Sequence, residues 1–477
     1  MAALFFALPA PTHIGASRAL NDDEKRQQPR NDGPTRRQLL AGAGAASLLA
    51  MTAISGPAQS APGGTPTQTE RRRVVLGFIP LVDCAPLVIA KEEGFFARHG
   101  LEVELSREPS WANIRDKVAV GALDGAHMLS AMPIAAALGI DSIAKPMVVA
   151  LNLNLNGNAI TLSRDVMERI GGIEPGQALA PARLKALIDA DRQAGRRRLV
   201  LASVFPFSSH NYLLRYWLAT GGIDPDADVR LVVVPPPQMV TQLAAGRIDG
   251  FCVGEPWNQR AAALGIGSIA VESHQIWNNH PEKVFAVGAD WAARNPDTHQ
   301  ALLRALIEAA AWLDRPENRP LAARILARPD YVGVGEATVA RSLSGQSGGE
   351  ENHLFFRRAA SFPWRSHADW LVTQMVRWGQ VRDLAKACAV ADSVYRPDLY
   401  RVAAASLGVA APAIDRKSEG VRAEPWTLAA ATAPIAMGPD QFIDRRVFDP
   451  TDLDGYLRAL PFAQSRRDGE IDAALRA

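Results

Sequence analysis

The sequence predicts an α/β protein whose two similar lobes face each other across a ligand cleft. The first reason is that strand-like apolar runs alternate with helical apolar spacing from Val74 to Gly139. The second is that short motifs of this region recur 125 residues further along the chain. Two α/β units joined by crossing segments can close around a ligand by hinge motion.

The first lobe is expected to begin with three strands that alternate with three helices. The expected strands cover 74–79, 101–105 and 126–129, and the expected helices cover 86–96, 111–120 and a segment from residue 133. Pro80 closes the first apolar run, and Gly94 stands where the first helix would stop. This order predicts right-handed crossovers and a parallel sheet. Ligands of such sheets bind at the carboxyl ends of strands, here near residues 80–84 and 106–111.

The second lobe is predicted from an internal repeat. Arg73-Val-Val-Leu recurs as Arg198-Leu-Val-Leu, and Gly121-Ala-Leu-Asp-Gly recurs at the same offset of 125 as Gly246-Arg-Ile-Asp-Gly. Between these anchors the second copy again reads strand (199–204), helix (211–219), strand (229–234) and helix (239–245). An alternating run at 151–162 is expected to carry the chain into this lobe, and residues 275–287 are expected to carry it back.

The N-terminal region has the features of a twin-arginine export signal. Arg36 and Arg37 precede a mildly apolar stretch at 39–54, and small residues follow at a position suited to cleavage. The apolar stretch is too short and too weak for a lasting membrane span. A disordered basic arm is the alternative. The export signal predicts a periplasmic protein.

These patterns divide the chain into six expected segments. They are the export signal (1–61), a linker (62–72), the first part of lobe 1 (73–155), lobe 2 (156–275), the second part of lobe 1 (276–407) and a C-terminal extension that wraps the surface (408–477).

Composition narrows the kind of partner and the chemistry. Of the 477 residues, 52 are Lys or Arg and 50 are Asp or Glu, and the export signal alone carries the net charge of +2. A neutral body argues against a nucleic-acid or membrane surface as the main partner. The three cysteines (Cys84, Cys252 and Cys388) form no Cys-x-x-Cys motif, so we expect buried thiols rather than a bridge, a nucleophile or a metal site. No cofactor is expected.

Several motifs resemble a known family. Lys91-Glu-Glu-Gly-Phe-Phe followed by Gly100-Leu is similar to the solute-binding proteins of ABC importers. Ser110-Trp-Ala-Asn-Ile-Arg-Asp-Lys-Val and Gly125-Ala-His-Met-Leu narrow the resemblance to the nitrate- and bicarbonate-binding branch. The resemblance spans about residues 72–460. It implies a type II periplasmic-binding-protein fold and a monomer that captures nitrate, or nitrite, and delivers it to membrane permease and ATPase subunits.

The same resemblance implies a set of ligand-binding residues. They are the Trp111 indole, the Asn158 amide (a glutamine in some members), the His210 imidazole, the Gly254 backbone amide and the Lys283 ammonium. Nitrate is a planar monoanion with three acceptor oxygens and no proton to donate. A site for it therefore needs several donors, one compensating charge and no exposed carboxylate. Lys283 would supply the charge, whereas His127 and His367 are expected to be structural.

Other interpretations remain open. Each predicted ligand residue taken alone is more often a core, capping, turn or solvated residue. A bicarbonate-binding paralogue is the first alternative; its relatives carry an acidic residue where Lys283 stands, and a bicarbonate hydroxyl would lack an acceptor among these donors. A cytoplasmic nitrate sensor of the same fold would lack the Arg36-Arg37 signal. An enzyme is disfavoured because the chain has no His-Glu-x-x-His motif and no Gly-rich phosphate loop.

Overall fold

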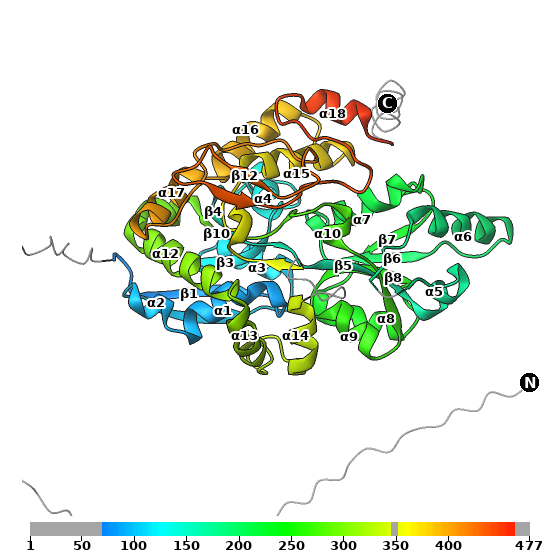
Figure 1. Ribbon diagram of the computed structural model, residues 1–477, viewed down its shortest axis with the longest axis horizontal. Helices are drawn as coiled ribbons and strands as arrows, with labels where there is room; N and C mark the ends of the chain where they lie inside the picture. The colour runs from blue at the N-terminus through cyan, green and yellow to red at the C-terminus, as the bar shows by residue number, and fades with distance from the viewer. Residues whose placement is uncertain (1–68, 175, 345–351, 463–477) are drawn as a thin grey trace, which may run out of the picture. The chain divides into compact units, whose positions relative to one another are not determined.

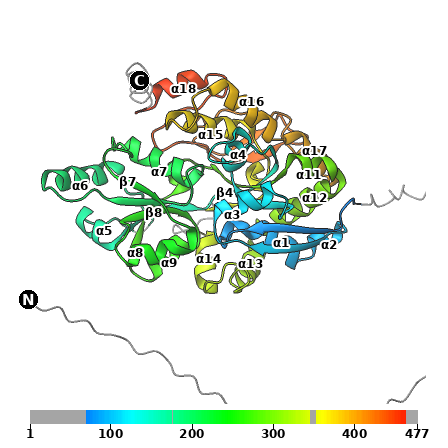
Figure 2. The same ribbon diagram turned by 180° about the vertical axis from the view of Figure 1, so that it is seen from behind.

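The computed structural model describes residues 69–174, 176–344 and 352–462. The predicted export signal lies outside these residues. Two β-sheets with helices around them form the body, as Figure 1 and the reverse view in Figure 2 show. Within the described residues, no helix combines the length and the apolar character that crossing a membrane requires.

The first sheet has six strands in the order β11-β4-β10-β3-β1-β2. Its strands are β1 (Arg73–Phe78), β2 (Glu102–Arg107), β3 (Gly125–Leu129), β4 (Met147–Asn156), β10 (Pro281–Gly288) and β11 (His353–Leu354). β1 pairs in parallel with β2 and β3, as predicted, but β10 runs antiparallel to both β3 and β4. The predicted parallel arrangement of the first three strands is therefore confirmed, and β10 adds an antiparallel part to the sheet. The sheet is mixed because the chain returns from the second lobe in the opposite direction.

The second sheet repeats this arrangement with five strands in the order β7-β6-β8-β5-β9. Its strands are β5 (Asn158–Ser163), β6 (Val200–Ser203), β7 (Arg230–Val233), β8 (Gly250–Gly254) and β9 (Gly267–Glu272). β6 is parallel to β7 and β8, whereas β5 is antiparallel to β8 and β9. The predicted two-lobed α/β fold is thus confirmed, since each sheet combines a parallel part with antiparallel strands at the chain crossings.

The sequence repeat marks equivalent hydrogen bonds in the two sheets. The Val75 amide donates to Asp124 Oδ2 at 2.9 Å, and the Val200 amide donates to Asp249 Oδ2 at 2.7 Å. The aspartate amides return hydrogen bonds to the carbonyl oxygens of the same valines. The Asp of each Gly-x-x-Asp-Gly motif therefore ties the start of the third strand to the first, which explains why both motifs recur at one offset.

The chain crosses between the sheets at Gly157. β4 ends at Asn156 in the first sheet and β5 begins at Asn158 in the second. Gly157 has φ +92°, and a Cβ there would collide with the ring of His353. Glycine therefore allows the backbone to turn sharply at a crowded point. The return path runs from β9 through the short helix α10 (Ser273–Ile276) to β10.

Helices pack around both sheets. Residues 158–272 contain the second sheet. The helices that precede or follow this segment in the chain are α1 (Ala85–Glu92), α2 (Phe95–Arg98), α3 (Trp111–Ala119), α4 (Met132–Leu138), α11 (Ala289–Arg294), α12 (Pro296–Leu313), α13 (Arg319–Leu326), α14 (Glu336–Ser344), α15 (Arg365–Arg377), α16 (Leu384–Val394) and α17 (Pro397–Ser406). Those within that segment are α5 (Arg164–Ile170), α6 (Pro181–Gln193), α7 (Ser209–Thr220), α8 (Met239–Ala244) and α9 (Trp257–Ala263). The predicted stop at Gly94 is confirmed, because its φ of +74° separates α1 from α2.

The C-terminal segment packs across both lobes. It contains the short strands β12 (Trp426–Leu428) and β13 (Ile435–Met437) and the helix α18 (Leu453–Ala459), drawn in orange and red in Figure 1. The Phe442 ring stacks on Trp277 with 4.7 Å between centroids. The Tyr216 hydroxyl of α7 donates to Asp444 at 2.9 Å. This segment therefore links the return crossing of the chain to a helix of the second lobe.

Candidate functional site

Six elements meet where the two sheets approach each other. From the first lobe come the 3-10 turn η1 (Val82–Cys84) after β1, the start of α3 and the start of β10. From the second lobe come the start of β5, the end of β8 and the start of α7. The Val82 amide donates to the Glu255 carbonyl at 2.8 Å, so the lobes touch here. Residues 80–84 and Trp111 thus lie at the predicted end of the sheet.

Lys283 lies at the centre of this region and is fully buried. Its Nζ donates to Asp83 Oδ2 at 2.6 Å and also to Glu282 Oε1. The same atom lies 5.5 Å from the centroid of the Trp111 ring, within the range of a cation–π contact. Burial opposes the ammonium charge, but the carboxylates of Asp83 and Glu282 outweigh it and raise the pKa of Lys283. The side chain is therefore a buried cation held by two anions.

Asp83 is anchored on its other side by His127. Asp83 Oδ1 lies 2.8 Å from His127 Nε2, and the Ile79 amide donates to His127 Nδ1 at 3.4 Å. Because Nδ1 accepts a hydrogen bond, Nε2 carries the proton that is donated to Asp83. Burial acts against ionisation of Asp83, yet Lys283 and His127 hold the pKa of this carboxyl well below its usual range. Burial lowers the pKa of His127, which supports the carboxylate as a neutral imidazole.

Glu282 places a second carboxylate in the middle of the donor residues. Its Oε2 accepts a hydrogen bond from Asn158 Nδ2 at 2.5 Å and another from the Ser209 hydroxyl. Its Oε1 accepts from Lys283 and lies 3.3 Å from His210 Nε2. Burial raises the pKa of Glu282, but the charge of the Lys283 ammonium acts in the opposite direction, and the pKa lies below its ordinary value. Glu282 is therefore an anion enclosed by donors of both lobes.

A bulge in β10 brings Glu282 and Lys283 to the same place. Neighbouring residues of a regular strand point to opposite faces of the sheet. In the pairing of β10 with β4, the register shifts between Pro281 and Lys283 and again between Lys283 and Val284. Such an irregularity redirects side chains locally, and here both charged groups reach the region between the lobes.

His210 is the second residue of α7 and lies beside Glu282. The Ser208 hydroxyl caps this helix by accepting from the Asn211 amide at 3.1 Å, which fixes His210 in the first turn. Neither ring nitrogen of His210 makes a hydrogen bond of good geometry to the described residues, although Nε2 is close to Glu282. Burial lowers the pKa of His210 to about 3, so the imidazole is neutral at physiological pH. It can offer one N–H to an anion.

Trp111, Asn158 and Gly254 complete the predicted set. Trp111 is the first residue of α3, and its buried Nε1 has no hydrogen-bond partner within the described part of the chain. Asn158 pairs with Gly254 across β5 and β8, and Asn158 Oδ1 is also without a partner among the described residues. A Cβ at Gly254 would lie 3.1 Å from Asp83 Oδ2. All five predicted residues therefore gather around the pair formed by Asp83 and Glu282.

Sequence reasoning missed three polar residues of this cluster: Asp83, Ser209 and Glu282. Asp83 follows the carboxyl end of the first strand, which was a usable signal, and Glu282 directly precedes Lys283. Lys283 is predicted to supply the positive charge of the site, and in the structure two carboxylates, those of Asp83 and Glu282, already contact it. The sequence argument against bicarbonate counted Asn158 only as a donor, whereas its Oδ1 is an acceptor that has no partner among the described residues.

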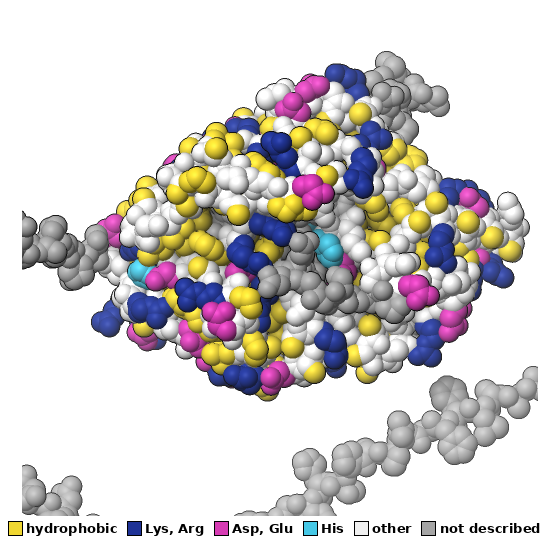
Figure 3. Space-filling view, in the orientation of Figure 1, with side chains coloured by type: hydrophobic (Ala, Val, Ile, Leu, Met, Phe, Trp, Pro, Cys, Tyr) yellow, Lys and Arg dark blue, Asp and Glu magenta, His cyan; other side chains and the backbone are white. Residues whose placement is uncertain are grey.

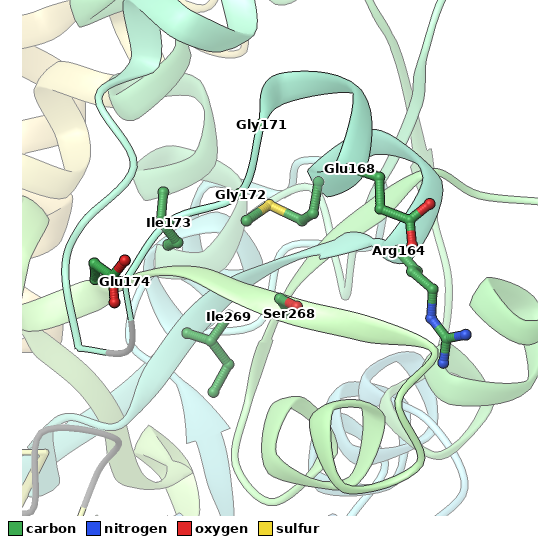
Figure 4. A pocket seen from close by; sticks show the side chains of 9 residues that line it. Arg164, Glu168, Gly171, Gly172, Ile173, Glu174, Ser268 and Ile269 are labelled. Carbon is green, nitrogen blue, oxygen red and sulfur yellow. The ribbon is translucent and has the colours of Figure 1, made fainter.

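A second hollow lies on the outer side of the second lobe, away from the predicted residues. Figure 4 shows Ile173 and Ile269 between the carboxylates of Glu168 and Glu174, near the start of β9. Two carboxylates, those of Glu168 and Glu174, line it together with one guanidinium, that of Arg164, so its charge does not favour an anion. The face drawn in Figure 3 carries Lys, Arg, Asp and Glu side chains dispersed over it, as expected of a chain with a neutral body.

The fold and the enclosed polar cluster define the class of the protein. Two α/β lobes with the same strand order, joined by two crossings and meeting at buried polar side chains, are the architecture of periplasmic binding proteins. Residues 67–327 match the model of the NMT1-like family. The chain belongs to this family, in the branch that contains the nitrate- and bicarbonate-binding proteins of ABC importers.

Individual relatives agree with this assignment. The nitrate/nitrite binding protein NrtA of a Nostoc species is 35% identical over 418 residues, which cover 85% of this chain and 89% of the relative. The bicarbonate-binding protein CmpA of Synechococcus elongatus is 33% identical over 82% of this chain and 87% of its own length. The nitrate import ATP-binding protein NrtC of a Synechocystis species is 42% identical over 71% of this chain, which spans about half (51%) of that relative.

A solved structure supports the same fold. The crystal structure of the periplasmic nitrate-binding protein NrtA from Synechocystis matches with a TM-score of 0.72 and 33% identity, covering 82% of this chain and 99% of that one. Identity to the nitrate- and bicarbonate-binding relatives differs by only a few per cent. The choice between the two anions therefore depends on the residues of the site.

Proposed function

We propose that this chain is the solute-binding component of an ABC importer that captures nitrate or nitrite. The observation that carries the proposal is the surrounding of Glu282. Lys283, Asn158 and Ser209 donate hydrogen bonds to its carboxylate, and His210 lies beside it. A carboxylate, like nitrate, is a planar oxyanion that only accepts hydrogen bonds. The side chains that the sequence assigns to nitrate thus form a shell that suits a planar anion.

Each predicted residue has a role in this proposal. Lys283 supplies the charge, and Asn158 and His210 supply neutral donors from the second lobe. The Trp111 ring lies beside Lys283, its buried N–H has no partner among the described residues, and the Gly254 backbone leaves space beside Asp83. Because donors come from both lobes, ligand binding would hold the lobes together.

Bicarbonate is the second candidate, and one observation favours it. The unpartnered Asn158 Oδ1 could accept a hydrogen bond from the bicarbonate hydroxyl. Lys283 favours nitrate, because a lysine cannot accept that hydrogen bond and repels the metal cation that an acidic residue would hold.

Calorimetric titration of the purified protein without its signal tests the proposal. We expect saturable binding of nitrate or nitrite, and no binding of chloride under the same conditions. Bicarbonate is titrated with and without Ca²⁺. Tighter binding of bicarbonate than of nitrate would reject the proposal in favour of the bicarbonate-binding paralogue.

The wider setting follows from the same proposal. The protein would leave the cytoplasm by the twin-arginine route, act as a monomer in the periplasm and contact the inner membrane through its permease. The ATP-binding partner is inferred from the name of one relative. The proposed role is ligand capture without catalysis.

A further inference from the structure

The buried cluster carries one net negative charge before any ligand binds. Asp83 and Glu282 are carboxylates, and Lys283 is the cation that contacts both of them. The nearby imidazoles of His210 and His280 have pKa values of about 3 and about 4 because they are buried, so they add no charge at neutral pH. Two anions thus face one cation, and all three side chains are completely buried.

A monoanion that enters this cluster adds a second net negative charge. Coulomb repulsion between like charges grows as distance and effective dielectric fall, so the cost is high among side chains that are completely buried. Glu282 cannot carry its charge into solvent by a small movement, because it extends from β10, which lies between β3 and β4 inside the first sheet. The remaining way to remove its charge within the closed site is to add a proton.

Glu282 also holds the donors that the ligand needs. Lys283 and Asn158, both predicted to bind nitrate, donate to its two oxygens. We propose that Glu282 is an internal competitor for the anion site, and that the anion binds together with one proton, which converts Glu282 into a neutral carboxylic acid. This inference rests on the proposed function, because it concerns the same site and the same anion.

The proposed protonation of Glu282 balances in atoms and in charge. It comes from bulk water or buffer and forms an O–H bond on a Glu282 carboxylate oxygen, while nitrate keeps its charge and all its bonds. The Lys283 ammonium is then free to donate to the ligand, and the new O–H becomes one more donor. The total charge of the cluster is the same before and after binding. A group that repels the anion as a carboxylate would therefore support it as an acid.

Other titratable groups face Glu282 from every packed element. They are Asp83 of η1, His127 of β3, His210 of α7, Cys252 of β8, His280 before β10 and Lys283 of β10. Lys283 is already protonated, and burial raises the pKa of the Cys252 thiol, so neither takes up a proton. Asp83 keeps both oxygens on His127 and Lys283. His210 is the main competitor for the proton, and the experiment separates it from Glu282.

The test is calorimetric titration with sodium nitrate at constant ionic strength from about pH 5.5 to 8.5. Repeating each titration in buffers of different ionisation enthalpy gives the number of protons taken up. We expect about one proton per nitrate, and an affinity that falls by about tenfold for each unit of rising pH, because binding consumes a proton. Glu282→Gln should bind at least tenfold more tightly than the parent at pH 8, with no proton uptake and a flat pH profile.

Glu255→Gln is the matched control. Glu255 is another buried glutamate near the site, but burial raises its pKa to about 8, and its Oε2 accepts from the Gln259 amide rather than from the anion donors. This variant should keep the proton uptake of the parent. Infrared difference spectra of the parent, with and without nitrate, should show a new carboxylic-acid C=O band. That measurement needs no variant and distinguishes a carboxyl group from an imidazole.

The outcomes are separable. Nitrate binding without proton uptake would overturn the inference and leave the proposed function intact. So would proton uptake that persists in Glu282→Gln, the absence of the carboxylic-acid band, or weaker binding by Glu282→Gln at pH 8. Failure of the parent to bind either nitrate or nitrite at every pH would instead reject the proposed function, and the inference with it.

Discussion

Replacing Lys283 with alanine should destabilise the protein as well as weaken its ligand binding. Both carboxylates place an oxygen within hydrogen-bond distance of Lys283 Nζ, so their charges lie about 5 Å apart. At an effective dielectric of about 20, two like charges at that distance repel by about 3 kcal/mol. Removing one partner of a buried ion pair typically costs about 3–5 kcal/mol. We therefore expect the thermal midpoint at neutral pH to fall by about 6 °C or more, at ~2 °C per kcal/mol.

The loss should depend on pH in a defined direction. In the parent, the pKa values of Asp83 and Glu282 are lowered by folding. Their pairing therefore stabilises the parent above the unfolded pKa values and is lost as pH falls through the folded ones. Without Lys283, burial is expected to raise both pKa values above those of the unfolded chain. The unpaired carboxylates then destabilise the variant at neutral pH, and protonation on acidification removes this destabilisation. The difference in thermal midpoint between parent and variant should therefore be smaller at pH 4.5 than at pH 7.5.

Thermal unfolding followed by circular dichroism at both pH values measures this effect. Lys185→Ala is the control, because Lys185 pairs with Asp189 on the surface, where the two side chains are 28% and 38% exposed. That change should alter stability by less than about 0.5 kcal/mol. Nitrate affinity of Lys283→Ala should fall about ten- to a hundredfold, since a charged hydrogen bond contributes about 1.5–3 kcal/mol. The reasoning would be refuted by a midpoint difference that does not change with pH, or by a nitrate affinity of Lys283→Ala within about threefold of the parent.

Three further predictions concern ligand contact, closure and export. Trp111→Phe keeps an aromatic ring beside Lys283 but removes the indole donor. Because one neutral hydrogen bond is lost, the nitrate affinity measured by titration should fall about three- to tenfold. An unchanged affinity would place the indole outside the site. Small-angle scattering should give a smaller radius of gyration with nitrate than without, and an equal radius would indicate a rigid site. Replacing Arg36 and Arg37 with lysine should leave precursor in the cytoplasm in cell fractionation, and normal export would contradict the twin-arginine interpretation.

The lobes were predictable because their information is local and repeated. Short apolar runs and alternating apolar residues located β1, β2 and β3. The shared offset of Asp124 and Asp249 identified the second copy of the unit. The direction of β10 was not predictable. A strand pattern reads the same for parallel and antiparallel pairing, and only the path of the intervening lobe decides from which end the strand enters.

The candidate site was predictable as a set of donors but not as a balance of charges. Motif resemblance pointed to Trp111, Asn158 and Lys283, and the structure places all three in one buried cluster. Glu282 was overlooked because a glutamate beside a lysine usually reads as part of a solvated surface. Burial depends on contacts from distant segments, here Asn158 and Ser209, and neither is near Glu282 in the sequence.

The bulge in β10 explains why the charge balance of the site was not predicted. In a regular strand, Glu282 and Lys283 would point to opposite faces, and a lysine in the buried cluster would imply a glutamate outside it. With the shifted register at Lys283, both belong to the buried cluster, so the residue chosen for its positive charge brings a negative charge with it. Affinity for an anion then depends less on the number of donors than on how the carboxylate is neutralised. Within this geometry, the titration of Glu282 should decide at which pH the site binds nitrate.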